Sequence, residues 1–189
     1  MGFRKLREMN LALLGKQAWC LITRPNSLVT QVYKSRFYPD GTFFDAVPSS
    51  NPSFIWCGLL EVQEVMRRGC RRCIGDGLTT QIGRDPWLPI DDDPYISTPL
   101  HKSIFYAPIC FLLNNQGFGY DENCVEDIFN EWDAHIILII PVSLRRPNDA
   151  WVWYKESKGA YTVKSCYRML IGEVHDERPW RLIWNMRVP

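Results

Sequence analysis

The sequence predicts an α+β fold whose front part is rich in helix. Residues 4–22 and 53–68 carry apolar side chains at spacings of three and four, which is the period of an amphipathic helix. Two later stretches, residues 79–82 and 151–154, hold the β-branched and aromatic side chains that favour strands, and turn residues lie beside each. We therefore expect a helix-rich N-terminal part followed by two short β-hairpins and short helices.

Three helices are expected in the front part. Pro25 follows the first helix, and Ser27 is placed to cap a second helix over residues 27–37. Residues 38–41, Tyr-Pro-Asp-Gly, are typical of a turn. Ser53 is a candidate N-cap for the third helix.

The two hairpins are predicted from turn chemistry. Gly75-Asp76-Gly77 suits a tight turn, because glycine accepts positive φ and aspartate bonds its own backbone. The Thr79-Thr80-Gln81-Ile82 stretch would supply a strand of this first hairpin. In the second hairpin, Trp151–Tyr154 and Ala160–Val163 would pair around Ser157-Lys158-Gly159.

The rest of the chain is expected to hold a loop and short helices. Residues 90–105 contain Asp91-Asp92-Asp93 and little periodicity, which is typical of an exposed acidic loop. Short helices are expected at residues 122–130, 131–138 and 163–171, and another opens at residues 180–184.

Charge is strongly segregated along the chain, although the net charge is only +1. Residues 1–84 carry 12 Lys+Arg and 6 Asp+Glu. Residues 85–135 carry one Lys and 10 Asp+Glu, and residues 136–189 carry nine Lys+Arg and five Asp+Glu. This pattern fits a protein that offers one face to a polyanion, and it equally fits ordinary solvated surfaces. A hydrophobic content of 46% and a charged content of 23% exclude wholesale disorder.

The run Arg67, Arg68, Arg71 and Arg72 is the main candidate for contact with nucleic acid. On a helix the 67/71 and 68/72 pairs share a face, where like charges repel unless an anion neutralises them. Guanidinium groups match phosphate oxygens, whereas the alternative is a helix C-terminus that favours cations. A second candidate set lies around the first helix and comprises Arg4, Lys5, Arg7 and Lys16.

No metal, cofactor or catalytic centre is expected. Cys70-x-x-Cys73 has no second ligand pair, whereas a structural zinc site takes four ligands. Three histidines stand far apart, and a polymerase Tyr-x-Asp-Asp motif is absent. Seven irregularly spaced cysteines, without a signal peptide or an apolar run of about 18 residues, predict reduced thiols in a nuclear or cytosolic protein without a membrane partner.

Several motifs resemble one family in the same order along the chain. Ile74-Gly75-Asp76-Gly77 and Asp85-Pro86-Trp87-Leu88-Pro89 resemble the "rIGdG…sDPWLP" block of plant non-LTR (LINE-type) retrotransposon reverse transcriptases. The further matching stretches are GFRKL at 2–6, NLALLGKQ at 10–17 with Trp19, YKSRFYP at 33–39, SNPS at 50–53 with Trp56, IPVS at 140–143 with Arg146-Pro147 and Asp149, GAYTVKSCY at 159–167 and the final Trp180, Ile183, Trp184, Val188 and Pro189.

The resemblance implies the region between the polymerase domain and the C-terminal zinc-binding domain of that enzyme. Residues 1–68 would be a thumb-like helical segment, and residues 69–150 a connector with a β-hairpin and an acidic loop. Residues 151–189 would start the zinc-binding region, truncated before its zinc ligands. In the related block, an apolar residue and an arginine stand where Cys70 and Cys73 do.

The function implied is that of a non-catalytic fragment with at most residual RNA or DNA binding through its basic patches. Its partner in the parent protein would be the remainder of the reverse transcriptase. The alternative is a nucleic-acid-binding or protein-interaction module used by the host, also without enzymatic activity. Because thumb helices lean on the polymerase body, exposed apolar faces are expected on the isolated chain.

Overall fold

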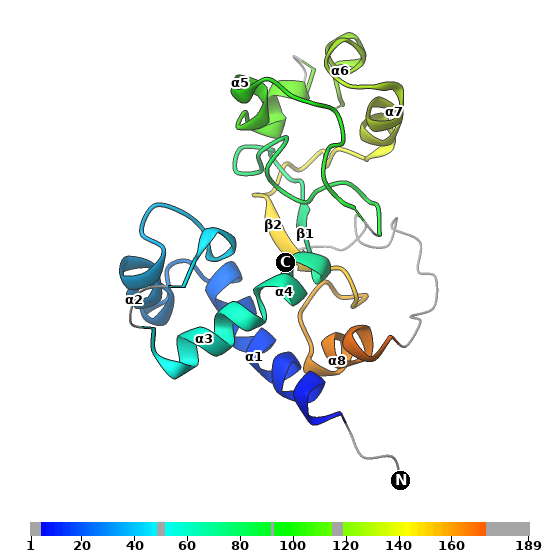
Figure 1. Cartoon of the computed structure of the whole chain (residues 1–189). Coiled ribbons are helices and arrows are strands. Elements are labelled where there is room, and N and C mark those ends of the chain that lie inside the picture. The colour runs from blue at the N-terminus through cyan, green and yellow to red at the C-terminus, as the bar shows by residue number, and fades with distance from the viewer. Residues whose placement is uncertain (1–4, 49–51, 92, 115–118, 173–189) are drawn as a thin grey trace. The chain divides into compact units, whose positions relative to one another are not determined.

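A computed structural model describes residues 5–48, 52–91, 93–114 and 119–172 (Figure 1). The chain forms two compact units, which are described separately. Unit 1 comprises Met1–Cys70 with Trp153–Arg178, and unit 2 comprises Arg71–Val152 with Pro179–Pro189. Helices dominate the described residues, with one small antiparallel sheet, so the predicted α+β class is confirmed.

Unit 1 is helical, as predicted for the front of the chain. Its elements are α1 (Leu6–Thr23), α2 (Leu28–Phe37), the 3-10 turn η1 (Phe43–Asp45), α3 (Phe54–Glu61), α4 (Gln63–Gly69) and α8 (Val163–Ile171). Ser27 and Ser53 cap α2 and α3 by accepting the backbone N–H of Thr30 and Trp56, at 3.2 and 3.3 Å. The third predicted helix is present but is interrupted at Val62.

The core of unit 1 uses small residues on α1 and a cluster of aromatic rings. Ala12, Gly15 and Ala18 are buried at spacings of three, which lets other elements approach α1 closely. α1 packs against α8, α3 and α4. A second part of the core surrounds Trp56, on which the ring of Phe37 stacks at a centroid distance of 4.3 Å.

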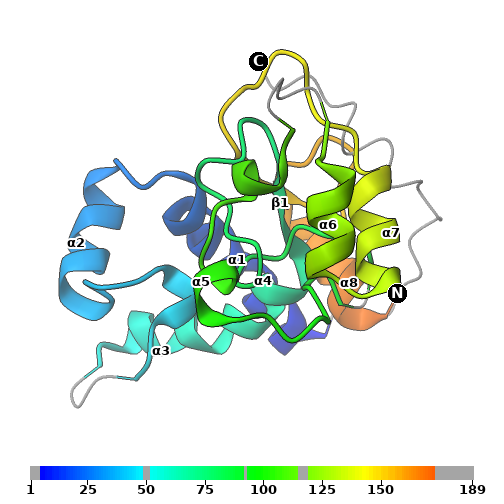
Figure 2. The ribbon, with the colours of Figure 1, turned by 90° about the horizontal axis from the view of Figure 1, so that it is seen from above.

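Unit 2 is built from loops and short helices around one apolar core. Its helical elements are α5 (Lys102–Phe105), the 3-10 turn η2 (Ile109–Leu112), α6 (Glu122–Ile128) and α7 (Glu131–Ile139). α6 and α7 lie side by side, as the two views in Figures 1 and 2 agree. Both confirm predicted short helices, as α8 does in unit 1. The helix expected at residues 180–184 lies outside the described residues.

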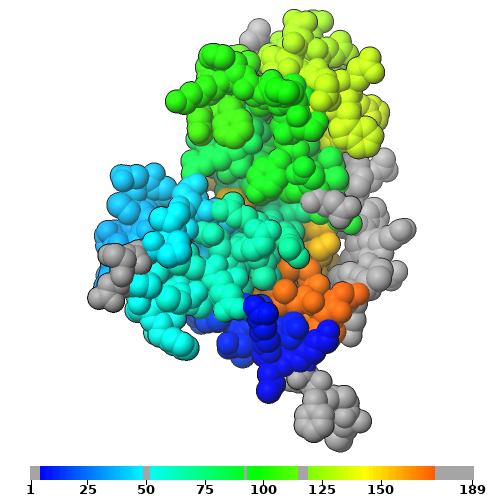
Figure 3. Space-filling model, viewed as in Figure 1, coloured from blue at the N-terminus to red at the C-terminus, as the bar shows by residue number. Residues whose placement is uncertain are grey.

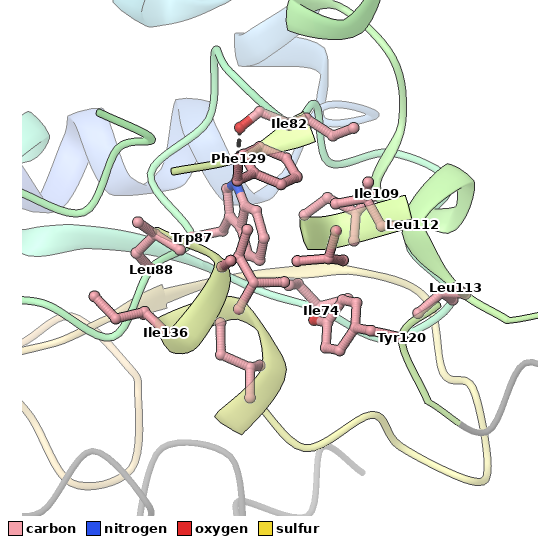
Figure 4. Packing of buried hydrophobic residues seen from close by; sticks show 14 residues of the cluster. Ile74, Ile82, Trp87, Leu88, Ile109, Leu112, Leu113, Tyr120, Phe129 and Ile136 are labelled. Atoms are coloured by element: carbon pink, nitrogen blue, oxygen red, sulfur yellow. Dashed lines mark hydrogen bonds between the residues drawn. The ribbon is translucent and has the colours of Figure 1, made fainter. Parts of the chain in front are cut away.

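The core of unit 2 is centred on a buried tryptophan (Figure 4). Trp87 is fully buried, and its Nε1–H donates to the backbone carbonyl of Ile82 at 2.8 Å. Apolar side chains from η2 and α7, among them Ile109 and Ile136, belong to the same cluster. Trp87 therefore contributes the largest side chain of this core.

The strand pairing differs from the prediction. β1 (Cys70–Cys73) pairs with β2 (Ala150–Trp153), and the two predicted hairpins are wrong. Residues 79–82 pair with neither strand, because their amide groups are used elsewhere, as described below. The stretch 160–163 is not a strand, because Thr162 accepts the backbone N–H of Ser165 at 3.1 Å and so begins α8.

Among the described residues, the helices are too short or too polar to span a lipid bilayer.

Candidate functional site

The arginine run does not continue on one helix. α4 ends at Gly69, so Arg67 and Arg68 lie on its last turn, whereas Arg71 and Arg72 lie on β1. A Cβ atom on Gly69 would lie 2.1 Å from the indole ring of the last residue of β2, so this position requires glycine. The expected helical face of four arginines is therefore wrong, because successive side chains of a strand point to opposite sides.

Arg72 is buried and fully engaged inside unit 2. Its Nε donates to Thr80 Oγ1 at 3.0 Å, and its Nη2 donates to Thr79 Oγ1 at 2.6 Å. The guanidinium lies 3.7 Å from Asp149 Oδ2 and 5.0 Å from the ring centroid of Trp151. Burial lowers the pKa of Arg72, and the carboxylates around it oppose that shift. The side chain of Arg72 thus forms an ion pair with Asp149 inside unit 2.

Arg71 is also buried, with 4% of its surface exposed. Its Nη2 donates to the backbone carbonyls of Asp91 at 2.8 Å and Ile90 at 3.4 Å. The side chain thereby fixes the start of the acidic loop to β1. Two of the four arginines of the run are thus parts of the folded core and are not directed at solvent.

Asp149, which the sequence analysis did not single out as a site, is the centre of this arrangement. Its Oδ1 accepts the backbone N–H groups of Gly75 at 2.8 Å and Gly77 at 2.9 Å. Its Oδ2 accepts both the N–H and the hydroxyl of Thr79 and of Thr80, at 2.9 to 3.1 Å. The side chain is fully buried. The amides of Gly75, Gly77, Thr79 and Thr80 therefore bind a carboxylate instead of a strand, which is why no hairpin forms there.

The glycines of this loop are needed for close approach. Gly77 has a φ of +72°, which glycine adopts without a steric penalty. A Cβ atom on Gly75 would lie 1.8 Å from the backbone carbonyl oxygen of Pro147, so no side chain fits. The Gly75-Asp76-Gly77 turn was correctly predicted as a turn, but it wraps around Asp149 and does not join two strands.

Asp149 carries a stabilised negative charge. Burial alone would favour the neutral carboxyl, yet the hydrogen bonds from Gly75, Gly77, Thr80 and Thr79 lower its pKa below the ordinary value. Arg72 neutralises the charge. The loop, the ion pair and the start of β2 therefore form one connected polar network, here called the Asp149 network, inside unit 2.

A second buried aspartate of unit 2, Asp133, also binds two consecutive hydroxyl residues through one carboxylate oxygen. Its Oδ2 accepts the N–H and the hydroxyl of Ser97 at 3.0 and 3.1 Å, and those of Thr98 at 2.7 and 2.5 Å. The side chain is almost fully buried. In both cases a buried aspartate holds two consecutive hydroxyl residues. A Ser/Thr-Thr pair in a loop is the sequence signal for such a contact, although it does not identify the aspartate.

The remaining candidate residues of the arginine run lie at the surface of unit 1. The side chain of Arg67 is 39% exposed and that of Arg68 is 71% exposed. Both lie near Glu64, at 4.0 and 3.6 Å. Arg67 also donates to the backbone carbonyl of Phe44 and lies over its ring. Arg4 lies outside the described residues.

The candidate residues of α1 are exposed as well. Arg7 is 79% exposed and lies 3.1 Å from Glu61, while Lys16 Nζ donates to the backbone carbonyl of Tyr161 at 3.4 Å. Lys5 is exposed at the N-cap of α1. Such solvent-exposed ion pairs are weak, so these cations remain accessible to another anion.

The two units differ in charge. The described residues of unit 1 hold 12 Lys+Arg and 6 Asp+Glu, whereas those of unit 2 hold 6 Lys+Arg and 11 Asp+Glu. The segregation seen along the sequence is therefore also a segregation between folded units. Any electrostatic attraction for a polyanion belongs to unit 1.

The cysteine pair is not arranged as a chelate. Cys70 and Cys73 lie three residues apart on β1, where side chains at that spacing point to opposite faces. Burial raises the pKa of the Cys73 thiol to about 11, which disfavours the thiolate that metals bind. Within the described ranges, no three His, Cys, Asp or Glu side chains lie close enough together to hold a metal ion.

The chain is similar to two plant proteins. It is 34% identical over 94 residues to "Uncharacterized mitochondrial protein AtMg00310" of Arabidopsis thaliana, a match that covers 50% of this chain and 60% of that protein. It is 24% identical over 213 aligned residues to "Putative ribonuclease H protein At1g65750" of the same plant, which covers 100% of this chain and 32% of that protein. The chain thus spans less than two thirds of the length of either relative. No family model and no solved structure matches it.

Proposed function

We propose that the chain is a non-catalytic region of a plant non-LTR retrotransposon reverse transcriptase, equivalent to its thumb-like segment and connector. The observation that carries this proposal is the match of the whole chain to about a third of a longer plant protein whose name refers to ribonuclease H. The motifs that resemble plant reverse transcriptases lie in the same order along the chain and agree with it. The Asp149 network gives the motif "rIGdG" a structural role in that region.

Contact with RNA or DNA, where it persists, is proposed for the exposed cations of unit 1: Lys5, Arg7, Lys16, Arg67 and Arg68. The carboxylates that lie near the three arginines, Glu61 and Glu64, are themselves at least half exposed. A phosphate group can therefore replace either carboxylate at little cost. Arg71 and Arg72 are left out, because their guanidinium groups are buried.

Fluorescence polarisation with a labelled RNA hairpin and a labelled DNA duplex tests this contact. We expect binding that weakens steeply between about 50 and 200 mM salt, because phosphate contacts release counterions. The double variant Arg67→Glu, Arg68→Glu should lose most of the binding. Arg145→Glu with Arg146→Glu, an adjacent exposed pair in unit 2, is the matched control and should bind as the wild type does. Equal loss in both variants, or no binding at low salt, contradicts the proposed contact.

The proposal includes no polymerase or nuclease activity for this chain alone. Primer extension and cleavage of an RNA–DNA hybrid, each with Mg²⁺, should both be absent. Turnover that survives repurification would overturn the non-catalytic assignment.

The alternative, a module used by the host, predicts a different genomic setting. Polymerase motifs upstream and a Cys/His cluster downstream of the coding sequence, even if stop codons interrupt them, would support a retroelement fragment. An intact host reading frame with neither would support the module.

A further inference from the structure

The outer face of α2 is apolar and exposed. Leu28, Val29 and Val32 are 76%, 60% and 54% exposed. The opposite face of α2 contacts the aromatic cluster, where Tyr33 and Phe37 pack against the tryptophan of α3. A helix of ten residues is marginal in water by itself, so a partner on its outer face would stabilise it. α2 lies at the surface of unit 1, blue in Figure 3.

A cation completes this apolar stripe. Leu28, Val32 and Arg36 are spaced by four residues and therefore start from one face of the helix, and the guanidinium of Arg36 lies over the ring of its neighbour Phe37, 5.2 Å from the centroid. No acidic residue occurs between Arg24 and Pro39. A partner for this face therefore needs apolar side chains along its length and an acidic group near the C-terminal end of α2.

α7 in unit 2 presents a face of this kind. Its buried side, including Ile136 and Ile137, belongs to the core of unit 2. Its exposed side carries Trp132, which is 65% exposed, and Ile139, which is 44% exposed. Glu131 lies on the same side in the first turn of α7.

The two exposed faces have the same spacing and opposite charge. The face of α2 consists of residues at positions i, i+1, i+4 and i+8, which are Leu28, Val29, Val32 and Arg36. The face of α7 has the same spacing and consists of Glu131, Trp132, His135 and Ile139. In an antiparallel pair of helices Arg36 would lie opposite Glu131, Val32 opposite His135, and Leu28 opposite Ile139.

We propose that α2 of one copy of this chain docks antiparallel on α7 of a second copy. The charges of the units favour this occupant, since unit 1 is basic and unit 2 is acidic. Helix dipoles favour it too, because an antiparallel arrangement places the partly negative C-terminus of α2 beside the partly positive N-terminus of α7. A nucleic acid would leave the apolar stripes uncovered, and an anionic membrane would repel the acidic end of the α7 face.

The contact predicts the form of the assembly. Each copy offers one α2 face and one α7 face. A twofold rotation between copies closes this contact as a dimer, other closing rotations give a larger ring, and a rotation that does not close gives an open chain of copies. The proposal goes beyond the function proposed above, because it does not depend on the origin of the chain or on nucleic-acid binding.

Sedimentation velocity of the full chain from about 5 to 200 µM tests the proposal, because the sedimentation coefficient of a self-associating protein rises with its concentration. Arg36→Glu and Glu131→Arg should each weaken association by about ten-fold or more, because each places like charges opposite one another. The double variant Arg36→Glu, Glu131→Arg should restore association, since the ion pair is re-formed with reversed polarity.

Two matched controls make this test specific. Lys34→Glu changes the same charge on the same helix but off the stripe, and Glu126→Arg does so on the neighbouring helix α6. Both should associate nearly as the wild type does, and circular dichroism should show that all variants are folded. The proposal is overturned if the wild type stays monomeric at every concentration, if the double variant fails to recover, or if Lys34→Glu matches Arg36→Glu. A rise of the sedimentation coefficient with concentration would also show that the contact forms between copies, because a contact within one chain does not depend on concentration.

Discussion

Arg72 and Asp149 form a buried ion pair, with 3.7 Å between Nη2 and Oδ2 and side-chain exposures of 8% and 0%. Asp149 directly precedes β2, and Arg72 lies on β1. The pair therefore links the two strands of the sheet to the loop at residues 75–80, whose amides bind the same carboxylate. A buried ion pair is costly to break by removing one partner, because the other charge is left without compensation.

We expect Asp149→Ala to destabilise unit 2 by about 3 to 5 kcal/mol. The substitution leaves the guanidinium of Arg72 without its ion-pair partner and four amides of the loop at residues 75–80 without their acceptor. Urea unfolding followed by tryptophan fluorescence measures the loss. Asp127→Ala, at an exposed aspartate on α6, is the control and should change the free energy of unfolding by less than about 0.5 kcal/mol. A similar midpoint for the two variants would show that the network adds little stability.

The lowered pKa of Asp149 predicts an acid-sensitive contribution to stability. Because the folded pKa lies below the unfolded value of about 3.9, the contribution is complete above that value and is lost as the pH falls through the folded pKa. Urea midpoints of the wild type at pH 7, 5, 4 and 3 should therefore fall more steeply than those of Asp149→Asn. The raised pKa of Asp85 acts in the opposite direction, and because the charge of Asp149 contributes to that shift, it reduces the difference between the two proteins. Parallel pH profiles would contradict the prediction.

Gly75→Ala should cost more than Gly172→Ala. Gly172 has a φ of +77°, and no atom of the described residues lies within 4 Å of the position that its Cβ would take, so the left-handed backbone is penalised, by about 1 to 2 kcal/mol. At Gly75 the new methyl group would clash with the carbonyl oxygen of Pro147. The backbone at one of these two residues would have to move to relieve the clash. Thermal unfolding of both variants gives the ranking. Should Gly172→Ala prove the more damaging, the close approach at Gly75 is not rigid.

Tyr161→Phe should lower the stability of unit 1 by about 1 kcal/mol. The hydroxyl of Tyr161 donates to the backbone carbonyl of Ala12 at 2.7 Å in a buried position, and its ring packs beside Gly15. The phenylalanine keeps the ring but removes the donor. Tyr106→Phe, at a half-exposed ring, controls for the general effect of losing a hydroxyl and should be neutral in chemical denaturation.

The helices were predictable because their signals are local. Ser27 and Ser53 cap the helices that the periodicity indicated, and the short helices near residues 122–139 follow the same rule. The sheet was not predictable from local pattern. β1 and β2 lie about eighty residues apart in sequence, and nothing in either strand specifies the other.

The site was predictable only in part. Charge identified Arg67 and Arg68, which lie at the surface, but it also selected Arg71 and Arg72, which are buried. The difference depends on Asp149, whose carboxylate compensates a cation far away in the sequence. The sequence shows how many charged residues there are, whereas the burial of a given arginine depends on whether an opposite charge lies beside it in the fold.

The long-range contacts of both units also constrain the order in which the chain folds. The loop at residues 75–80 receives its acceptor from a residue 69 to 74 positions later, and Ala12 receives its donor 149 positions later. On a ribosome, which supplies the chain from its N-terminus, neither unit has its complete set of partners until the last helices have emerged. A nascent chain that stops before residue 149 would therefore leave the loop at residues 75–80 without its carboxylate acceptor and the surface of α1 around Ala12 without Tyr161. Neither unit could complete its fold in such a chain, and chaperones would bind a partly folded polypeptide.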